Sequence, residues 1–252
     1  MPGFRRTDKR ISKESRLLWL NCPDIAAKVA PGQFVMVRCG GGSTLPRPFS
    51  IFRTYGGDLA ILYAVYEGGI GTEWLAERHT GDLMQIMGPL GNGFTLDPMT
   101  RNILLIGGGI GIAPLYFLAQ DAVAHLRSVT FLYGTANRGR YPIPPEFKPV
   151  QATEDGSVGY KGYITDLIPQ YIDKAEQIFV CGPLSMLKTI AQQKNDFKLA
   201  GKQVQVSLEV RMGCGAGVCY SCSIHTKQGL KQVCKDGPVF NFDDVFWDEL
   251  TG

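Results

Sequence analysis

Four cysteines near the end of the printed sequence constrain the fold of this chain more than any other feature. They are Cys214, Cys219, Cys222 and Cys234, inside the segment "RMGCGAGVCYSCSIHTKQGLKQVC". The spacing is C-x4-C-x2-C, followed after eleven residues by the fourth cysteine, and this is the spacing of plant-type 2Fe-2S proteins. Gly213, Gly215 and Gly217 allow the loop to wrap closely around a cluster, because glycine accepts backbone angles that other residues resist. The segment therefore predicts a 2Fe-2S site.

A structural zinc site with four cysteine ligands is the alternative to the cluster. Zinc sites usually show two similar C-x2-C knuckles, whereas three of these cysteines share one loop, so the pattern favours the cluster. The other three cysteines, Cys22, Cys39 and Cys181, are scattered, and we expect them to be small buried side chains. An odd total of seven excludes a complete disulfide framework within the chain. The N-terminus lacks a secretory pattern, so we expect a cytoplasmic protein with reduced thiols.

Two different patterns precede the cysteines. Residues 15–96 form short alternating or apolar runs separated by glycine and proline, which predicts a β-sandwich or β-barrel. One helix, "TEWLAERH", interrupts them, with Thr72 as its expected N-cap. From residue 102 to about 207, strands alternate with helices, as in "NILLI", "LYFLAQDAVAHL" and "SVTFLYG", which predicts a parallel sheet with crossovers. The last 45 or so residues fit neither pattern, and a module this small normally needs metal or disulfides.

Composition excludes two broad classes of function. The formal net charge is only +3 and no run of Lys and Arg occurs, so we expect no nucleic-acid partner. The uncharged run at residues 103–119 contains four glycines and a proline and is slightly shorter than the ~20 residues that a membrane span needs. We therefore expect no membrane span, and we interpret this run as a strand, a tight turn and the start of a helix.

The turn "GGGIGIAP" after the strand "NILLI" is a candidate dinucleotide site. The residues concerned are Gly107, Gly108, Gly109, Gly111 and Pro114. A glycine-rich turn between a strand and a helix lets pyrophosphate oxygens approach backbone amides at the positive helix end. The match to G-x-G-x-x-G is incomplete, because Pro114 stands at the third glycine position.

The choice between NAD and NADP depends on acidic residues further along the chain. The segment "FLYGTANRG" has none at the end of its strand, but Glu154 and Asp155 follow the next strand. Carboxylates accept a hydrogen bond from a ribose 2′-hydroxyl and repel a 2′-phosphate, so the pair favours NAD. An exposed acidic turn without a ligand is the equally simple alternative.

Two short motifs in the first part of the chain are suited to phosphate and ring contacts. In "RPFSI", Arg47 can pair with phosphate, and Ser50 can offer its hydroxyl to a ring nitrogen. The segment "GGIGTEW" adds a possible anion site at the start of a short helix.

Together, "RPFS", "GGIGT", "GGGIGIAP", "CGPLSM" and the four cysteines resemble the ferredoxin–NADP reductase superfamily, and within it the electron-transfer subunits of NAD-dependent dihydroorotate dehydrogenases. The resemblance covers nearly the whole chain, and the C-terminal segment is its most specific part. It implies an antiparallel FAD-binding β-barrel at residues 1–99, an NAD-binding α/β domain at 100–207 and a 2Fe-2S domain at 208–252.

The resemblance also implies roles for individual residues. The flavin and its phosphates would contact Arg47, Pro48, Phe49 and Ser50. The strand Ala64, Val65 and Tyr66 would lie along the flavin, and Gly71 and Thr72 would hold the pyrophosphate. The strand end at Cys181, Gly182 and Pro183 would lie near the nicotinamide.

A flavin is also expected on chemical grounds, because hydride transfer moves two electrons whereas a 2Fe-2S cluster takes one at a time. Once the three modules are assigned, no stretch of the sequence remains to form a pocket for an organic substrate. We therefore expect a partner protein that exchanges electrons with this chain. The resemblance implies an FMN-containing dihydroorotate dehydrogenase catalytic subunit, in a heterotetramer with two copies of each chain. The alternative partner is an oxygenase, a ferredoxin or a sulfur-reducing system.

The C-terminal segment "FNFDDVFWDEL" has apolar residues at helical spacing, namely Phe242, Val245, Phe246 and Leu250. This face would lie at the partner interface or, as is more common, pack on the chain's own surface.

Overall fold

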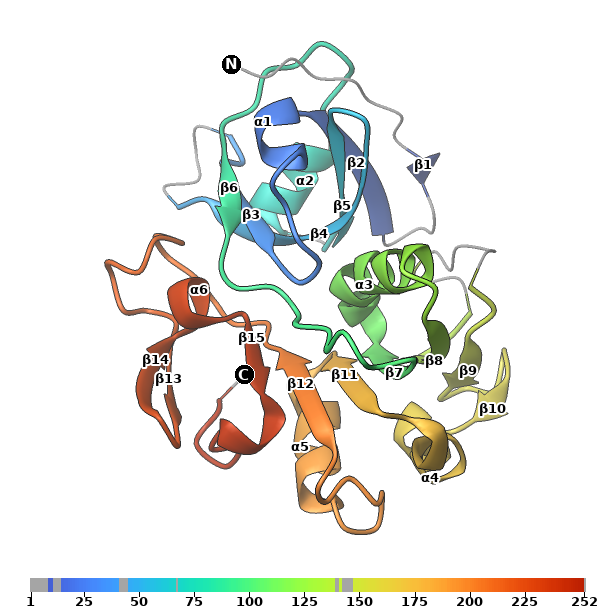
Figure 1. The fold of residues 1–252 in the computed structure, drawn as a ribbon. Coiled ribbons are helices and arrows are strands. Elements are labelled where there is room, and N and C mark those ends of the chain that lie inside the picture. The colour runs from blue at the N-terminus through green and yellow to red at the C-terminus, as the bar shows by residue number, and fades with distance from the viewer. Residues whose placement is uncertain are drawn as a thin grey trace.

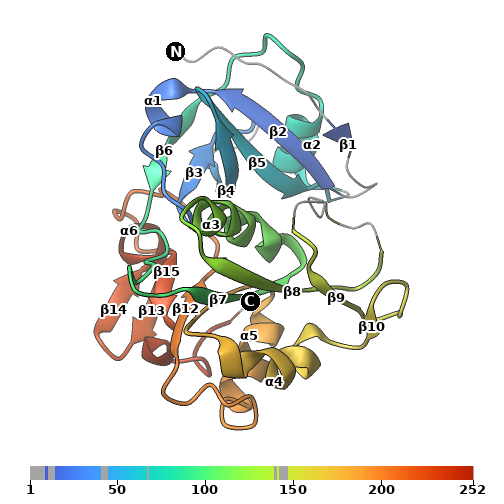
Figure 2. The same cartoon turned by 45° about the vertical axis from the view of Figure 1, so that its right-hand side comes forward.

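The structure is a computed structural model that describes residues 9–10, 15–40, 45–66, 68–138, 141 and 147–251. A β-sheet domain forms one end of the molecule, an α/β domain the other, and the cysteine-rich segment lies beside both (Figure 1). Figure 2 shows helix α3 (Ile112–Ala124) between the two sheets.

The first sheet has six antiparallel strands in the order β1-β2-β5-β4-β3-β6. Their bounds are β1 Lys9–Arg10, β2 Ser15–Asn21, β3 Phe34–Val37, β4 Arg47–Tyr55, β5 Asp58–Ala64 and β6 Ile86–Leu90. The sheet curls around an apolar interior that includes Leu18, Val35, Ile51 and Ile61. This confirms the predicted β-barrel.

Two short helices accompany the barrel, α1 (Pro23–Ala26) and α2 (Ile70–Ala76). The expectation that Thr72 caps α2 is wrong, because the helix begins at Ile70, three residues earlier than expected, and Gly69 is the N-cap residue. The Thr72 hydroxyl instead donates to the carbonyl oxygen of Gly69, at 3.2 Å. Glycine is also accepted at the N-cap, so the helix can begin before the threonine. The sequence argument considered only the threonine side chain and therefore placed the helix start too late.

The second sheet has seven strands in the order β10-β9-β8-β7-β11-β12-β15. Their bounds are β7 Asn102–Gly108, β8 Ser128–Thr135, β9 Val150–Thr153, β10 Tyr160–Lys161, β11 Gln177–Cys181, β12 Gln203–Ser207 and β15 Val239–Asn241. All neighbours are parallel except β15, which pairs antiparallel with β12. The predicted α/β architecture is confirmed. The chain moves outward from β7 to β10 on one side and then from β11 to β12 on the other, so the direction of winding reverses between β7 and β11.

Helices cover both faces of the second sheet. On one face, α3 packs against β7, β8 and β11 and against the barrel, and the rings of Phe52 and Tyr116 stack there with centroids 4.3 Å apart. On the other face lie α4 (Ile168–Tyr171), α5 (Leu184–Gln192) and the 3-10 helices η2 (Ile164–Leu167) and η3 (Ile172–Lys174). A further 3-10 turn, η1 (Gly109–Gly111), joins β7 to α3. Apolar burial against α3 therefore joins the two domains.

The C-terminal segment adds β13 (Ser223–Thr226), β14 (Gly229–Gln232), α6 (Val233–Asp236), β15 and the 3-10 helix η4 (Phe242–Asp244). Because β15 pairs with β12, this segment shares a sheet with the α/β domain. The domain boundaries 1–99, 100–207 and 208–252 stay predictions. Within the described ranges, no helix is long and apolar enough to cross a membrane.

The helical face expected within residues 240–250 does not form an α-helix, because β15 and the 3-10 helix η4 occupy its first part. Phe242 and Val245 are buried in the chain's own core, and Leu250 packs against that core. The indole of Trp247 donates to the carbonyl oxygen of Phe242, at 3.0 Å. The apolar residues are explained by packing on the chain's own surface, whereas Phe246 is 41% exposed.

Candidate functional site

The four thiols of the C-terminal segment lie in a loop whose backbone amides point at sulfur. The amides of Ala216, Val218 and Cys219 lie 3.3–3.4 Å from the Cys214 sulfur, which accepts from all three. The Gly217 amide donates to the Cys234 sulfur at 3.2 Å. Donors aimed at sulfur stabilise thiolates, which are the form that binds metal. The donor set therefore fits an iron–sulfur cluster.

Local hydrogen bonds divide the four thiols into two kinds. The Ser221 hydroxyl beside the exposed Cys219 lowers the pKa of that thiol to about 6. The amide of Ala216 is the main cause that lowers the pKa of Cys214. Burial raises the pKa of Cys234 to about 11, so this thiol must be deprotonated by ligation itself.

The thiols also interact with one another, Cys214 with Cys219, and Cys234 with both Cys222 and Cys214. A two-iron cluster takes four cysteine ligands, and the loop brings four thiols into mutual interaction. Among the residues that the structure describes, no three His, Cys, Asp or Glu side chains gather around one point in the manner of a single-ion site.

The predicted flavin residues on β4 alternate between the two faces of the sheet. Phe49 is buried in the barrel interior, whereas Pro48 and Ser50 lie on the other face and are partly exposed. Arg47 begins the strand and is exposed. Its side chain lies beside the start of α2, because a Cβ added to Gly71 would meet the Arg47 side chain at 3.4 Å.

The neighbouring segment after β5 leads toward the second domain. Ala64 is buried, Val65 is partly buried and packs on the barrel core, and Tyr66 is 56% exposed. Tyr66 lines a cavity of about 780 Å³ whose other walls belong mostly to the α/β domain. The barrel and the α/β domain thus share one cavity.

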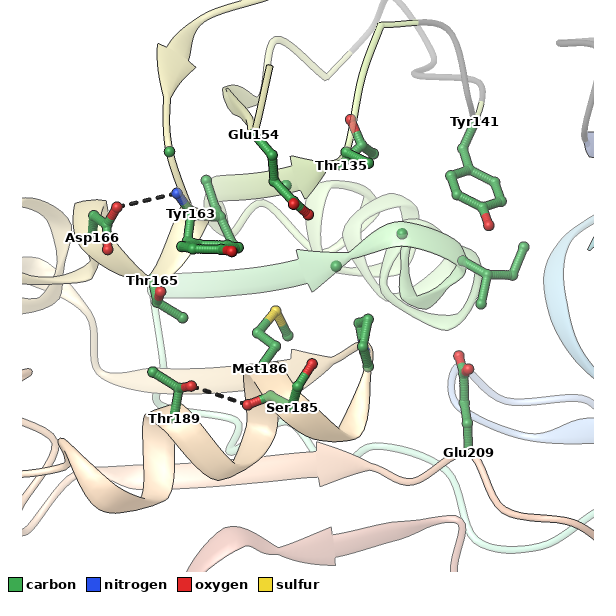
Figure 3. A pocket seen from close by; sticks show the side chains of 18 of the residues that line it. Thr135, Tyr141, Glu154, Tyr163, Thr165, Asp166, Ser185, Met186, Thr189 and Glu209 are labelled. Carbon is green, nitrogen blue, oxygen red and sulfur yellow. Dashed lines mark hydrogen bonds between the residues drawn. The ribbon is translucent and has the colours of Figure 1, made fainter. Parts of the chain in front are cut away.

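This cavity lies at the carboxyl ends of β7 and β11, where the winding of the parallel sheet reverses. Open α/β sheets bind ligands at this kind of switch point. Gly108, Gly109 and Pro183 line it, and side chains from several loops point inward (Figure 3). A cavity of this size and place fits a dinucleotide.

The remaining predicted glycines act by close packing between β7 and β11. A Cβ on Gly111 would overlap the carbonyl oxygen of Cys181, and one on Gly182 would lie 3.0 Å from the backbone of Gly108. Gly107 lies between aromatic side chains of β8, and Pro114 is buried within the first turn of α3. Gly111 and Gly182 therefore allow the ends of β7 and β11 to approach closely, whereas Gly107 and Pro114 pack in the interior, and none of the four lines the cavity.

The two acidic candidates separate in the structure. Glu154 lines the cavity, and Figure 3 shows its carboxylate pointing inward beside Tyr163. The Ser157 hydroxyl is the main cause that lowers the pKa of Asp155, and the Ser157 amide also donates to the Asp155 carboxylate, at 2.9 Å. Only Glu154 is thus in place to meet a ligand in the cavity.

Sequence reasoning missed several residues that the fold brings to the cavity. They are Thr135, Tyr141, Tyr163, Thr165, Asp166, Ser185, Met186, Thr189 and Glu209. They lie at the end of β8, in η2, in α5 and in the segments that connect the elements. Nearness to a strand end is the signal in the sequence that could have suggested some of them.

Glu209 lies toward the opposite end of the cavity from Glu154 (Figure 3). Its side chain is exposed toward the cavity, and desolvation by the surrounding protein raises the pKa of its carboxyl group. The buried Cys181 thiol donates to its Oε1 at 3.7 Å. Burial also raises the pKa of the Cys181 thiol, which is 0% exposed and lies behind Glu209 rather than in the cavity wall.

The fold and the site define a class, the flavin reductases with a ferredoxin reductase-like fold and an added iron–sulfur module. Residues 6–94 match the family model described as oxidoreductase FAD-binding domain, and residues 209–246 match that of the iron–sulfur cluster binding domain of dihydroorotate dehydrogenase B. The chain binds FAD and an iron–sulfur cluster accordingly.

Similar curated proteins include two named dihydroorotate dehydrogenase B (NAD(+)), electron transfer subunit. The one from Desulforamulus reducens is 40% identical over 90% of this chain and 91% of its own length. The one from a Geobacillus species is 38% identical over 94% and 95%. The chain belongs to the family of dihydroorotate dehydrogenase B electron transfer subunits.

Solved structures show the same fold. One described as the NADH-dependent reduced ferredoxin-NADP oxidoreductase, from work on flavin-based electron bifurcation, has a TM-score of 0.87 at 28% identity, covering 99% of this chain and 91% of its own. A ferredoxin reductase in carbazole 1,9a-dioxygenase has a TM-score of 0.69 at 20% identity, over 82% of this chain and 68% of its own. The second similarity concerns the fold alone.

Proposed function

We propose that this chain passes electrons between NAD and a partner subunit that oxidises dihydroorotate to orotate, a step of pyrimidine biosynthesis. The observation that supports this best is that the barrel borders both the nucleotide cavity and the cysteine loop. Tyr66 of the barrel lines the nucleotide cavity, and Met36 on β3 packs against Gly215 of the cysteine loop. When bound, FAD exchanges two electrons with the nicotinamide and single electrons with the cluster.

On the barrel, we assign flavin binding to the residues of β4, the end of β5 and the start of α2. Arg47 would pair with phosphate beside Gly71 and Thr72, and Ser50 would donate its hydroxyl to the flavin ring. Pro48, Val65 and Tyr66 would shape the surface against which the ring lies, and the buried Phe49 and Ala64 would support it from behind. The proximity of Arg47 to Gly71 supports this, because it places the Arg47 side chain next to the start of α2.

In the α/β domain, Gly108 and Gly109 would approach the NAD pyrophosphate, and Glu154 would accept from the adenosine ribose. Gly107, Gly111, Pro114, Cys181 and Gly182 would position the turn and the strand end, and Pro183 would border the nicotinamide. Asp155 would act by holding its turn. Cys214, Cys219, Cys222 and Cys234 would ligate the 2Fe-2S cluster.

We further propose that the partner is an FMN-containing catalytic subunit, joined in a heterotetramer with two copies of each chain, in the cytoplasm. The exposed edge of the cysteine loop supports a docking role, since Val218 is 75% and Tyr220 62% exposed beside Cys219. Exposed apolar side chains next to a redox centre suit a protein contact.

The experiment is anaerobic purification of this chain with the dihydroorotate dehydrogenase catalytic subunit of its own source. We expect a brown complex that contains flavin and iron and that reduces NAD with dihydroorotate. A complex with both cofactors and no response to dihydroorotate or orotate would contradict the assignment of the partner. A colourless protein that contains zinc would contradict the electron-transfer function itself.

A second candidate is a reductase that exchanges electrons with a ferredoxin. The similarity over nearly the full chain to the reduced ferredoxin-NADP oxidoreductase structure favours it. The higher identity to the dihydroorotate dehydrogenase subunits favours the first proposal. NADH oxidation that depends on added ferredoxin and not on orotate would decide for the second.

A further inference from the structure

Two residues of β3 and two of β4 lie on the outer face of the barrel, on the side of the cysteine loop. In their antiparallel register Met36 lies opposite Pro48 and Phe34 opposite Ser50. Directly opposite residues of an antiparallel pair point to the same face. Val35 and Val37 point to the barrel interior, so Met36 shares its face with the proposed flavin residues Pro48 and Ser50.

The Met36 side chain reaches the cysteine loop. Met36 is 1% exposed and belongs to the same buried cluster as Cys222 and Cys234. A Cβ added to Gly215 would lie 2.5 Å from Cγ and 3.0 Å from Sδ of Met36. Gly215 has a φ of +70° and directly follows Cys214, so only glycine allows this approach without strain.

A second contact holds the other end of the loop on the barrel. The Asn92 amide donates to the carbonyl oxygen of Gly237 at 2.5 Å, and its side-chain nitrogen donates to that of Asp236 at 3.0 Å. Gly237 ends the short helix α6, which contains Cys234. The loop is thus held near its first and its last cysteine, and the barrel itself orients it.

We propose that Met36 is a positioning residue that sets the separation between the flavin and the cluster. This inference rests on the proposed function, since it needs flavin at Pro48 and Ser50 and a cluster at the four cysteines. The rate of electron transfer between two centres falls steeply with their separation. A close-packed contact keeps that separation constant, because protein interiors are hardly compressible.

The test compares Met36→Ala, Met36→Leu and Val37→Ala in the full chain loaded with FAD and cluster. Val37 is the matched control, since it is buried on the same strand but faces the barrel interior. Rapid mixing with NADH would follow flavin reduction and then cluster reduction by their separate absorption bands. Visible circular dichroism, the cluster's reduction potential, iron content and the melting temperature of the iron-free chain would be measured alongside.

We expect Met36→Ala to slow cluster reduction several-fold, with flavin reduction, iron content and cluster potential unchanged. Met36→Leu, which nearly keeps the side-chain volume, should restore the rate. Val37→Ala should lower the melting temperature of the iron-free chain comparably and leave the rate unchanged. If the Met36→Ala variant does not retain its cluster, the Met36→Val variant is used instead. Its shortened side chain should slow cluster reduction in the same way.

Two results would overturn the proposal: an unchanged rate in the shortened variants, or an equal slowing by Val37→Ala. If NADH failed to reduce either centre in the unsubstituted chain, the proposed function would fall, and this inference with it. If NADH reduced both centres normally in the unsubstituted chain, but the Met36 variants reduced the cluster as fast as the Val37→Ala control, the proposed function would stand and this inference would be wrong.

Discussion

Burial decides the chemistry of the cysteines outside the loop. Cys22 and Cys39 are 2% and 1% exposed, and this burial raises the pKa of each thiol to about 11. Thiolates, not thiols, react with alkylating reagents. Their position in the barrel interior therefore makes these two residues inert in the folded chain.

We predict that iodoacetamide at pH 8 modifies neither Cys22 nor Cys39 in the folded chain, and modifies both in urea. Mass spectrometry of peptides would measure this. Between pH 9 and about 11 the unfolded chain releases these protons while the folded chain keeps them, so stability should fall as pH rises through this window. Rapid labelling of Cys22 or Cys39 without denaturant would contradict the buried barrel core.

Glu154 is the residue at which cofactor choice can be tested. Removing its charge should weaken repulsion of a 2′-phosphate, which at ~4 Å in water is about 1 kcal/mol, or roughly fivefold in affinity. We predict that Glu154→Gln raises kcat/KM for NADPH relative to NADH by about that factor, as steady-state kinetics would measure. Asp155→Asn is the control, because Asp155 faces its own turn. An equal effect of both changes would point to a general surface charge and contradict a ribose contact at Glu154.

At the scale of elements, the strand β15 and the turn η4 anchor the C-terminal segment to the α/β sheet. Phe242 is 2% exposed and its ring packs on Trp247 with centroids 4.4 Å apart. Lys194 and Asp243 form an ion pair at 2.5 Å across the same junction. The loop of cysteines is thus supported by the barrel on one side and by this sheet edge on the other.

We predict that Phe242→Ala destabilises the folded chain by about 3–5 kcal/mol, because it removes a large buried ring. Phe246→Ala, in the same segment but 41% exposed, should change stability by only about 0.5 kcal/mol. Urea unfolding followed by tryptophan fluorescence would measure both. Similar values for the two variants would mean that the segment does not pack as the structure shows.

At the scale of the whole molecule, the barrel borders the nucleotide cavity through Tyr66 and the cysteine loop through Met36, and the proposed flavin face of Pro48 and Ser50 is on the same side as Met36. The loop edge at Val218 and Tyr220 is exposed. An electron path that ends at an exposed edge needs a partner that covers it.

We predict that Val218→Glu weakens binding of the catalytic subunit about tenfold or more, which is roughly 1.4 kcal/mol. The cluster spectrum should stay unchanged, because only the amide of Val218 contacts sulfur. Leu126→Glu is the control, since Leu126 is 95% exposed at the end of α3. Sedimentation or surface-based binding with the catalytic subunit would measure the affinities. Equal weakening by both variants would contradict a docking surface at the loop edge.

Much of the fold was predictable from the sequence, because it depends on local patterns. Strand alternation predicted the barrel, the alternation of strands with helices predicted the parallel sheet, and cysteine spacing predicted the cluster loop. Sequence patterns failed where the same spacing of apolar residues is compatible with either a helix or an irregular segment. The apolar spacing of Phe242, Val245 and Leu250 suits a helix, but pairing of β15 with β12 took precedence.

The sequence by itself determined which cofactors this chain can hold, because cysteine spacing and glycine-rich turns are local requirements of the chemistry. Only the tertiary structure decided how these parts work together. It selected Glu154 over Asp155, brought Glu209 to Cys181, and placed Met36 against Gly215. These contacts join residues far apart in the chain, so they follow from how sheets and loops pack and not from any pattern of neighbouring residues.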